Sequence, residues 1–405
     1  MVKSTRGLLL SAAALMLTMG VAQAEIPSQG LKLGVLTDLS GFAADSTGPG
    51  SVAAAKLAIE DFHKEKPEIK VELIQGDHQN KADIGGALAR RWVDVDKVDA
   101  ILDVPFSSVA LAVQEVVRGS KAAFIASGPG TSLLTGEKCS PNTVQWSYDT
   151  WSLAHGTALA LLRAKKDSWF FVTADYAFGH SLENDAAAVV KAEGGKVLGT
   201  VRHPTGTADF SSFLLQAQAS KAKVVALANA VGDTINSVKQ ASEFGLQAGG
   251  QELAALLMQV TDVNAIGLGV AKGLYLTEAF YWDMNDGTRK FSDRFAALTG
   301  GKRPTMIQAG VYAGTLHYLR AAAAANTTDG QAIIAKMKEM PSDDPLFGKG
   351  TIRQDGRHIH NMYLFQVKSP AESKGPWDYY KLVQTIPAAE AFRPLADGNC
   401  PMIKK

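Results

Sequence analysis

The chain has 405 residues, of which 46% are hydrophobic and 20% are charged, so it is long and apolar enough to build a large core. Its 41 lysines and arginines nearly balance its 40 aspartates and glutamates, and no block of like charge occurs along it. This balance argues against nucleic acid or an anionic membrane surface as a partner.

The N-terminus has the pattern of a secretion signal. A basic head with Lys3 and Arg6 is followed by an apolar run over 8–19, and the small-x-small pattern at 22–24 predicts cleavage after Ala24. The alternative, an N-terminal membrane anchor, is disfavoured because the run is shorter than the roughly 20 residues that span a bilayer. Removing 24 of the 405 residues leaves an exported chain of 381, a length typical of about two domains.

Short apolar or β-branched runs alternate with amphipathic runs from Leu31 onward. The predicted strands cover 31–36, 71–76, 100–103 and 122–127, and the predicted helices cover 50–64, 82–93 and 108–118. Strands separated by helices of about 10–15 residues are typical of βαβ units with a parallel sheet that is covered on both faces.

The same pattern restarts near Trp151. Predicted helices at 151–163, 179–193, 210–220 and 232–244 alternate with predicted strands at 169–173, 196–201, 224–229 and 253–258. An apolar run at 273–280, helices at 289–298, 306–325 and 330–340, and strand-like runs at 362–367 and 379–384 follow. Because no linker rich in Pro, Gly or Ser separates the two halves, we expect several chain crossings and a stiff hinge.

The chain contains only two cysteines, Cys139 and Cys400. They are too far apart for a Cys-x-x-Cys metal pair, and an exported protein meets oxidising conditions. We expect one disulfide that fastens the C-terminal tail to a loop in the first third of the protein. Two unpaired buried thiols are the alternative.

Common catalytic signatures do not occur in the sequence. It lacks the Gly-x-Ser-x-Gly, His-Glu-x-x-His and Gly-x-x-x-x-Gly-Lys-Ser/Thr motifs, and the glycine-rich segment 37–51 lacks dinucleotide-binding spacing. The pair His358 and His360 could ligate a metal, but without a nearby acidic or thiol partner it more often occupies one face of a strand or turn. We expect no cofactor and no metal.

Two predicted strand ends in the first half carry residues suited to an anionic ligand. Phe106, Ser107 and Ser108 follow the strand at 100–103, and the helix that begins there offers free amides and the positive end of its dipole. Simple capping by either serine is the alternative. The next strand leads into Ser127, Gly128, Pro129, Gly130 and Thr131. The two glycines allow the backbone to approach a ligand closely, although a plain turn would also use them.

Aromatic and polar side chains gather near later strand ends. These residues are Trp146, Tyr148, Tyr176, Phe178, Asn229, Ala230, Met258 and Tyr281. Each aromatic ring taken singly is more often part of a core. Because open α/β sheets bind ligands at the carboxyl ends of their strands, the shared position favours a binding site.

Several segments together resemble a known family. They are LKLGVLTDLSG, FSS, AFIASGPGTSLLTG, WFFVTADYAFGHSLENDAAAVVKAEGGKVLGT and GDTINSVKQASEFGL. From about Leu31 to Phe392 the chain resembles the type I periplasmic substrate-binding proteins of ABC importers, the branched-chain amino-acid-binding-like group. The resemblance implies an α/β fold of two doubly wound lobes joined by a multi-crossing hinge. It also implies a periplasmic, monomeric, non-enzymatic receptor that delivers a small molecule to a permease with its ATPase.

The resemblance also implies lobe limits and ligand contacts. The N-terminal lobe would comprise 25–146 with about 280–350, the C-terminal lobe 147–279 with about 351–392, and the tail 393–405. The family's carboxylate contacts match Ser107 and the 128–131 turn. Its aromatic wall matches Phe178 with Tyr176 adjacent, and a further contact falls at 229–231.

One position departs from the family pattern. Amino-acid binders in the family carry an acidic residue after the strand at 253–258, where it pairs with the ligand's ammonium, and the matching residue here is Met258. Gln259 follows it. A neutral side chain cannot supply that charge-assisted bond. We therefore expect an aromatic or hydrophobic carboxylate rather than an α-amino acid. A branched-chain amino acid or amide, a sensor subunit and an extracytoplasmic enzyme remain alternatives.

Overall fold

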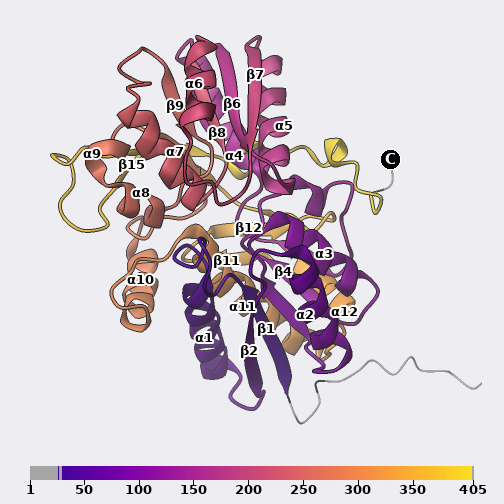
Figure 1. The fold of residues 1–405 in the computed structure, drawn as a ribbon. Helices are drawn as coiled ribbons and strands as arrows, with labels where there is room; N and C mark the ends of the chain where they lie inside the picture. Colours follow the sequence, from indigo (N-terminus) through magenta and orange to yellow (C-terminus); the bar gives the residue numbers. More distant parts are fainter. Residues whose placement is uncertain (1–25, 27–29, 404–405) are drawn as a thin grey trace, which may run out of the picture.

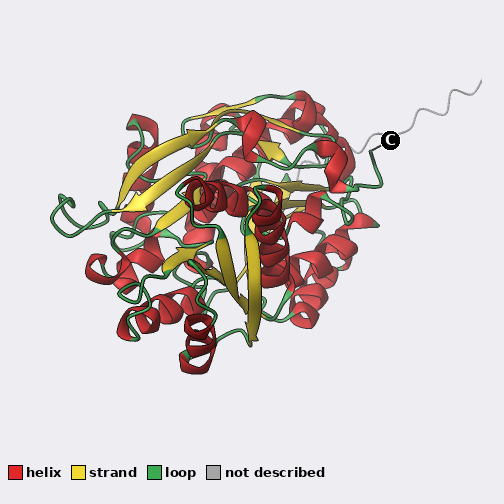
Figure 2. Cartoon of the chain, turned by 90° about the horizontal axis from the view of Figure 1, so that it is seen from above, coloured by secondary structure: helices red, strands yellow, loops and turns green. Residues whose placement is uncertain are grey.

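The computed structural model describes residue 26 and residues 30–403, so the predicted secretion signal lies outside the described residues. No helix in this part of the chain combines the length and hydropathy needed to cross a membrane. Two α/β lobes lie one above the other in Figure 1, each built around its own parallel sheet. In the view from above, helices flank the strands on both sides (Figure 2).

The N-terminal lobe, lower in Figure 1, contains a five-stranded parallel sheet with the order β2-β1-β3-β4-β5. Its strands are β1 (Leu31–Thr37), β2 (Val71–Asp77), β3 (Ala100–Asp103), β4 (Ala123–Ala126) and β5 (Thr143–Gln145). Its helices are α1 (Gly48–Glu65), α2 (Ala82–Asp94), α3 (Ser107–Arg118), η1 (Ser132–Thr135), α10 (Asp286–Leu298), α11 (Met306–Ala325) and α12 (Gly330–Glu339). Every residue of β3 and β4 is buried, which explains their continuous apolar runs.

The C-terminal lobe contains a four-stranded parallel sheet with the order β7-β6-β8-β9. Its strands are β6 (Ser168–Ala174), β7 (Lys196–His203), β8 (Val224–Ala228) and β9 (Glu252–Ala255). Its helices are α4 (Thr150–Arg163), α5 (Ala177–Ala192), α6 (Ser211–Ala219), α7 (Gly232–Glu243), α8 (Val260–Ile266) and α9 (Leu268–Ala271). The edge strand β7 alternates between exposed and half-buried residues, whereas the neighbouring β6 is almost wholly buried.

The remaining strands form two small antiparallel sheets. One has the order β10-β14-β15, with β10 (Tyr275–Glu278), β14 (Met362–Val367) and β15 (Tyr380–Ile386). The other comprises β11 (Ser342–Asp344), β12 (Gly348–Ile352) and β13 (His358–Ile359), and α13 (Ala388–Ala391) and η2 (Leu395–Gly398) follow in the tail. The chain passes between the lobes after β5, β10 and β13, so the hinge has several strands of chain. The residue limits of the lobes stay a prediction.

Several short elements differ from those predicted. The strand predicted at 253–258 ends at Ala255, because the carboxylate of Asp262 accepts the backbone N–H of Gln259 at 2.8 Å and starts α8. The short strand β5 was not predicted, since three residues are too few for a detectable period. The same reason applies to β11 and β13.

The predicted disulfide between Cys139 and Cys400 is confirmed. The two Cα atoms lie 5.6 Å apart, and the bond links positions 261 residues apart in the sequence. A guanidinium nitrogen of Arg393 also donates to the carbonyl oxygen of Ser132 at 3.2 Å. The tail is therefore fastened to the N-terminal lobe beside η1.

Replacing both Cys139 and Cys400 with serine should lower the free energy of unfolding. Closing a loop this long is worth about 4–5 kcal/mol in the chain-entropy model, and loss of a native disulfide commonly costs about 2–5 kcal/mol. Denaturant unfolding of the double variant beside the wild type measures the difference. Mass spectrometry of non-reduced peptides checks the bond itself, and two free thiols in protein purified without reductant would contradict it.

Candidate functional site

A cavity lies where the two lobes meet, and it is lined by strand-end loops of both. The N-terminal lobe, α11 and the first crossing contribute Ala43, Thr47, Pro105, Phe106, Gly128, Tyr148 and Ile307. The C-terminal lobe contributes Tyr176, Phe178, Ala230, Val231, Leu257 and Gln259. Its empty space is about 380 Å³ including the open mouth. The two lobes thus enclose a space of a size suited to a small ligand.

Aromatic rings from both lobes form one wall of this cavity. The ring centroid of Phe106 lies 5.9 Å from that of Tyr176, which in turn lies 6.0 Å from that of Phe178. A Cβ at Gly130 would come within 2.7 Å of Phe178 and 2.9 Å of Tyr148. Only glycine thus allows the turn after β4 to approach these rings so closely.

In each lobe, the turn that leads to the cavity lining has a strained backbone. Asp103, the last residue of β3, and Val104 after it have φ of 75° and 55°, and Val231 after β8 has φ of 47°. A β-branched residue with positive φ is a true outlier, and such conformations cost about 1–3 kcal/mol each. They are typically retained where a ligand clamp needs them. Here they direct Phe106 and Val231 to the cavity.

No charged side chain lines the cavity within the described part of the chain. Two helices instead begin at its wall, because their N-cap residues, Phe106 for α3 and Val231 for α7, are both lining residues. Neither N-cap side chain hydrogen-bonds the first turn of its helix. The free first-turn N–H groups of α3 and the positive end of its dipole are suited to an anionic group. In α7 the backbone N–H groups of Asp233 and Thr234 already donate to the carbonyl of Ala230, at 3.2 and 3.4 Å.

The predicted site residues divide into two groups. Six of them line the cavity, namely Phe106, Gly128, Tyr148, Tyr176, Phe178 and Ala230. The others lie outside its lining, namely Ser107, Ser108, Ser127, Pro129, Gly130, Thr131, Trp146, Asn229, Met258 and Tyr281. Sequence reasoning missed Ala43, Thr47, Pro105, Val231, Leu257, Gln259 and Ile307 as lining residues. Four of the seven, Pro105, Val231, Leu257 and Gln259, adjoin a predicted strand-end contact, so their neighbours gave a signal. The other three, Ala43, Thr47 and Ile307, lie far in sequence from every predicted contact.

Ser107 and Thr131, from the loops after β3 and β4, support the cavity wall from its buried side. The hydroxyl of Ser107 accepts the backbone N–H of Thr131 at 3.2 Å, which joins the two loops. The hydroxyl of Thr131 lies 3.0 Å from that of Ser181 on α5 in the opposite lobe. The carbonyl of Pro129 accepts the side-chain amide of Gln145 at 2.9 Å. These residues hold the turn that carries Gly128.

Trp146 and Tyr281 do not line this cavity, contrary to the expectation from the sequence. The ring of Trp146 is fully buried and stacks on His358 with centroids 4.0 Å apart. The hydroxyl of Tyr281 donates to the carbonyl of Trp377 at 2.7 Å, and its ring lies 4.7 Å from that of Tyr380. Each ring therefore packs in an aromatic cluster away from the cavity, with partners that are distant in sequence.

Asn229 and Met258 are also structural. The side-chain oxygen of Asn229 accepts the hydroxyl of Thr234 at 2.9 Å, which secures the turn between β8 and α7. Met258 is fully buried in the apolar core of the C-terminal lobe. Gln259 reaches the cavity in its place.

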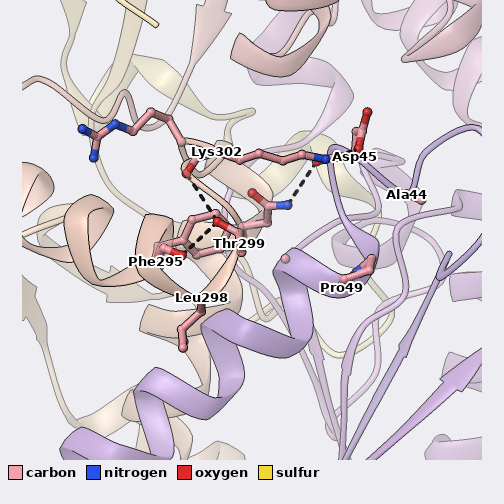
Figure 3. Close-up of a pocket in the computed structure, with 10 residues that line it drawn as sticks. Ala44, Asp45, Pro49, Phe295, Leu298, Thr299 and Lys302 are labelled. Carbon is pink, nitrogen blue, oxygen red and sulfur yellow. Dashed lines mark hydrogen bonds and ion pairs between the residues drawn. The ribbon is translucent and has the colours of Figure 1, made fainter. Parts of the chain in front are cut away.

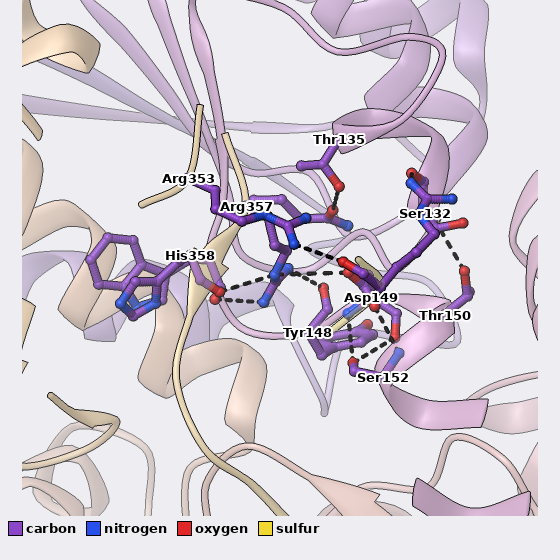
Figure 4. A network of polar contacts seen from close by, with 12 residues as sticks. Ser132, Thr135, Tyr148, Asp149, Thr150, Ser152, Arg353, Arg357 and His358 are labelled. Carbon is purple, nitrogen blue, oxygen red and sulfur yellow. Dashed lines mark hydrogen bonds and ion pairs between the residues drawn. The ribbon is translucent and has the colours of Figure 1, made fainter. Parts of the chain in front are cut away.

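A buried arginine fixes the first crossing between the lobes, as Figure 4 shows. The guanidinium of Arg357 donates to the carbonyls of Tyr148 at 2.8 Å and Trp146 at 2.9 Å. A carboxylate oxygen of Asp149 lies 3.8 Å from it. Burial lowers the pKa of Arg357 to about 10, so the side chain stays charged at neutral pH. It thereby holds the segment that carries Tyr148 to the cavity.

The histidine pair belongs to the same buried region. The Nε2 atom of His358 lies 2.7 Å from the hydroxyl of Ser342, and that of His360 lies 3.2 Å from the carbonyl of Trp146. Burial lowers the pKa of His360 to about 4, so its ring is neutral near pH 7. Across residues 26 and 30–403, no three His, Cys, Asp or Glu side chains are grouped so that they could hold a metal ion.

A second cavity, with about 550 Å³ of empty space including its open mouth, lies between the start of α1, α10 and α11 (Figure 3). Its polar groups already bind one another. The ammonium of Lys302 donates to Asp45 at 2.6 Å, and the amide of Gln308 donates to the carbonyls of Asp45 at 3.3 Å and Thr47 at 3.1 Å. This arrangement braces the loop before α1 and leaves little for a ligand to bind.

Comparison with known proteins identifies the family. The sequence model described as periplasmic binding protein matches residues 30–376. The chain therefore belongs to the periplasmic binding proteins, of the branched-chain amino acid ABC transporter type, with their two-lobed type I fold. These are extracytoplasmic solute-binding proteins that serve ABC transporters and are not enzymes.

Individual relatives agree with this assignment. A periplasmic binding protein from Burkholderia mallei is 46% identical, covers 93% of this chain and 100% of its own, and superposes with a TM-score of 0.90. A branched-chain amino acid ABC transporter ligand-binding protein from Burkholderia xenovorans is 39% identical, covers 92% and 99%, and has a TM-score of 0.82. A Leu/Ile/Val-binding protein homolog from Brucella suis is 28% identical over 74% of this chain and 77% of its own.

More distant solved structures share the fold alone. Solute-binding proteins of ABC transporters from Rhodopseudomonas palustris are 18–23% identical, with TM-scores of 0.77–0.79. They were solved in complex with benzoate, 3,4-dihydroxy benzoic acid and 4-hydroxybenzoate.

Replacing Arg357 with methionine should destabilise the protein by about 3–5 kcal/mol, because the change leaves buried carbonyls and Asp149 without their cation. Methionine fills much of the same space. Denaturant unfolding measures the loss. Arg289→Met is the control, since Arg289 forms exposed ion pairs that are worth about 0–1 kcal/mol. Equal effects of the two variants would contradict the role given to Arg357.

Stability should fall as the pH rises through the titration of Asp103. Its buried carboxyl accepts the hydroxyl of Thr37 at 2.8 Å, and burial raises its pKa to about 7 against that hydrogen bond. In the unfolded chain the pKa of Asp103 is near 4. The contribution of the protonated carboxyl to the free energy of unfolding is therefore fully present below about pH 4 and is lost progressively as the pH rises to about 7.

Asp103→Asn removes this dependence, so its stability relative to the wild type should increase between pH 5 and pH 8. The slope should approach about 1.4 kcal/mol per pH unit between the unfolded pKa, near 4, and the folded pKa of Asp103, about 7. Urea unfolding at both pH values measures the change. Asp94→Asn, at an exposed position, is the control and should show no such trend. Parallel pH profiles for wild type and Asp103→Asn would contradict the expectation.

Proposed function

We propose that this protein is a transport receptor that captures a small aromatic or hydrophobic carboxylate between its lobes. The observation that carries the proposal is the cavity's lining, which is mostly aromatic and aliphatic and includes no charged side chain in the described residues. An α-amino acid would bring an ammonium group into this space. Burying that charge without an acidic partner costs several kcal/mol, so a ligand without an ammonium fits better.

The carboxylate of such a ligand would lie at the start of α3. The backbone N–H groups of Ser107 and Ser108 belong to the first turn of that helix and donate to no N-cap side chain. The hydroxyl of Ser107 lies behind the cavity wall, where it accepts the backbone N–H of Thr131 and holds the loop that carries these N–H groups. The apolar body would then lie against Phe106 and Phe178.

The known proteins support two ligand classes. The structures with benzoate and hydroxybenzoates show that this fold accommodates small aromatic acids, as the aromatic wall here favours. A branched-chain amino acid is the second candidate, favoured by the names of the Brucella and Burkholderia xenovorans relatives. The uncharged lining of the cavity favours the aromatic acid over the amino acid.

We also propose how the receptor is used. The secretion signal would be cleaved after Ala24, and the mature protein would act as a monomer. The N-terminal lobe of 25–146 with about 280–350 would close on the C-terminal lobe of 147–279 with about 351–392 when a ligand binds. The closed form would dock on an ABC permease coupled to its ATPase. A sensor subunit of a signalling receptor would use the same closure.

Titration calorimetry of the mature protein tests the ligand class. Benzoate and its hydroxylated derivatives should bind, and leucine and valine should bind poorly because their ammonium finds no acidic partner. A ligand at 100 times its dissociation constant should also add about 2.7 kcal/mol of stability. Micromolar or tighter binding of leucine, with no response to the aromatic acids, would overturn the proposal.

Phe178→Ala extends the same experiment to the cavity wall. Removing this ring should weaken binding of the aromatic acid at least tenfold, since a buried aromatic side chain contributes well over about 1.4 kcal/mol. Phe244→Ala, at an exposed position at the end of α7, is the matched control and should leave affinity unchanged.

A further inference from the structure

Gln259 presents a carboxamide without a partner to the cavity. The residue is 1% exposed and lines the cavity, and neither its Oε1 nor its Nε2 has a hydrogen-bond partner among the described residues. More than about 90% of buried polar groups in native proteins are satisfied, because an unmade hydrogen bond is costly. The missing partner of Gln259 therefore belongs to whatever fills the cavity.

The position of Gln259 is held by contacts on both sides of the cleft. Its backbone N–H donates to the carboxylate of Asp262 at 2.8 Å. The other oxygen of that carboxylate lies 3.5 Å from the hydroxyl of Ser46, in the loop before α1 of the opposite lobe. Ser46 also lies 2.8 Å from the hydroxyl of Thr261. The lobes thus meet beside Gln259, and their contact fixes the start of α8.

The burial of Met258 determines the direction of the Gln259 side chain. The backbone of Gln259 is extended, and successive side chains of an extended segment point to opposite sides. Met258 is fully buried in the core of the C-terminal lobe. Gln259 is consequently turned toward the cavity, where its neighbours in the lining, Leu257 and Val231, are apolar.

The chemistry of a carboxamide restricts the group that can satisfy it. The carboxamide has an acceptor oxygen and N–H donors. A carboxylate could use only the donors, and an ammonium could use only the acceptor. A hydroxyl group serves both, because it donates to Oε1 and accepts from Nε2.

We propose that Gln259 recognises a hydroxyl group on the ligand, so that the receptor selects hydroxyl-substituted aromatic carboxylates over unsubstituted ones. This inference rests on the proposed function. The ligand spans the cavity, with its carboxylate at the start of α3 and its hydroxyl on Gln259. An unsubstituted acid leaves both polar atoms of Gln259 unpaired.

Calorimetry with benzoate and with 2-, 3- and 4-hydroxybenzoate tests the inference on the wild type and on Gln259→Leu. The wild type should bind at least one hydroxylated isomer about 10–100-fold more tightly than benzoate, the range expected for a hydrogen bond to an otherwise unsatisfied buried group. Gln259→Leu should lose this preference and bind benzoate as tightly as before or more tightly. Gln247→Leu, exposed in the same lobe, is the control.

The outcomes separate the inference from the proposed function. Equal affinity of the wild type for benzoate and all three isomers overturns the role of Gln259 but leaves the aromatic-acid receptor standing. A Gln259→Leu variant that weakens all four acids equally also overturns it, because the residue would then only position the site. Binding of none of these acids by the wild type overturns both. Thermal unfolding confirms that the variant is folded, and we expect its melting temperature to be unchanged or higher.

Discussion

The geometry of the cleft depends on the hydrogen bonds of one buried guanidinium, that of Arg357. Arg357 lies on the C-terminal chain just before its crossing, and its nitrogens bind carbonyls of the first crossing, at Trp146 and Tyr148. Those carbonyls follow β5 and have no strand to pair with, so they need a donor from elsewhere. Separating the two crossings would leave the buried guanidinium of Arg357 without its hydrogen-bond acceptors, which is costly. The two crossings therefore stay side by side. The orientation of Tyr148 toward the cavity follows from this contact.

Each lobe presents the cavity with the same local arrangement, although the two lobes share no sequence repeat. A buried parallel strand ends in a strained turn, and a helix begins at the cavity wall, at α3 in one lobe and α7 in the other. Parallel strands place all their carboxyl ends at one edge, so the two edges facing each other concentrate helix N-termini around one small space. An anionic group at the start of α3 would be stabilised by the dipole and free N–H groups of that helix, without any lysine or arginine among the described lining residues.

The lack of charge among the described lining residues has a consequence for specificity. Neutral donors and acceptors then decide which ligand fits, since each one that remains unpaired in a nearly dry space reduces affinity. Ser46 and Thr261, from opposite lobes, are in contact beside Gln259. Under the proposed closure of the lobes, this contact would form where the ligand's polar group is recognised.

Local sequence patterns predicted the two α/β lobes, their parallel sheets, the disulfide and the strand-end loops that carry Phe106, Tyr176 and Phe178. Hydrophobic period, glycine position and cysteine count depend on near neighbours or on composition, so they can be read without a structure. Aromatic residues could not be assigned in this way. Trp146 and Tyr281 lie near the same strand ends, yet tertiary partners that are distant in sequence, His358 and Tyr380, draw them away.

The position after β9 shows the same limit most clearly. The sequence has a neutral residue, Met258, where the family resemblance implies an acid in amino-acid binders, and that observation alone argued against an ammonium-bearing ligand. Only the tertiary structure decided that β9 ends early, that Met258 packs into the core and that Gln259 faces the cavity. The reason is physical, because a shift of one residue in an extended segment reverses which side chain faces inward, and the contact of Asp262 with the opposite lobe sets that shift.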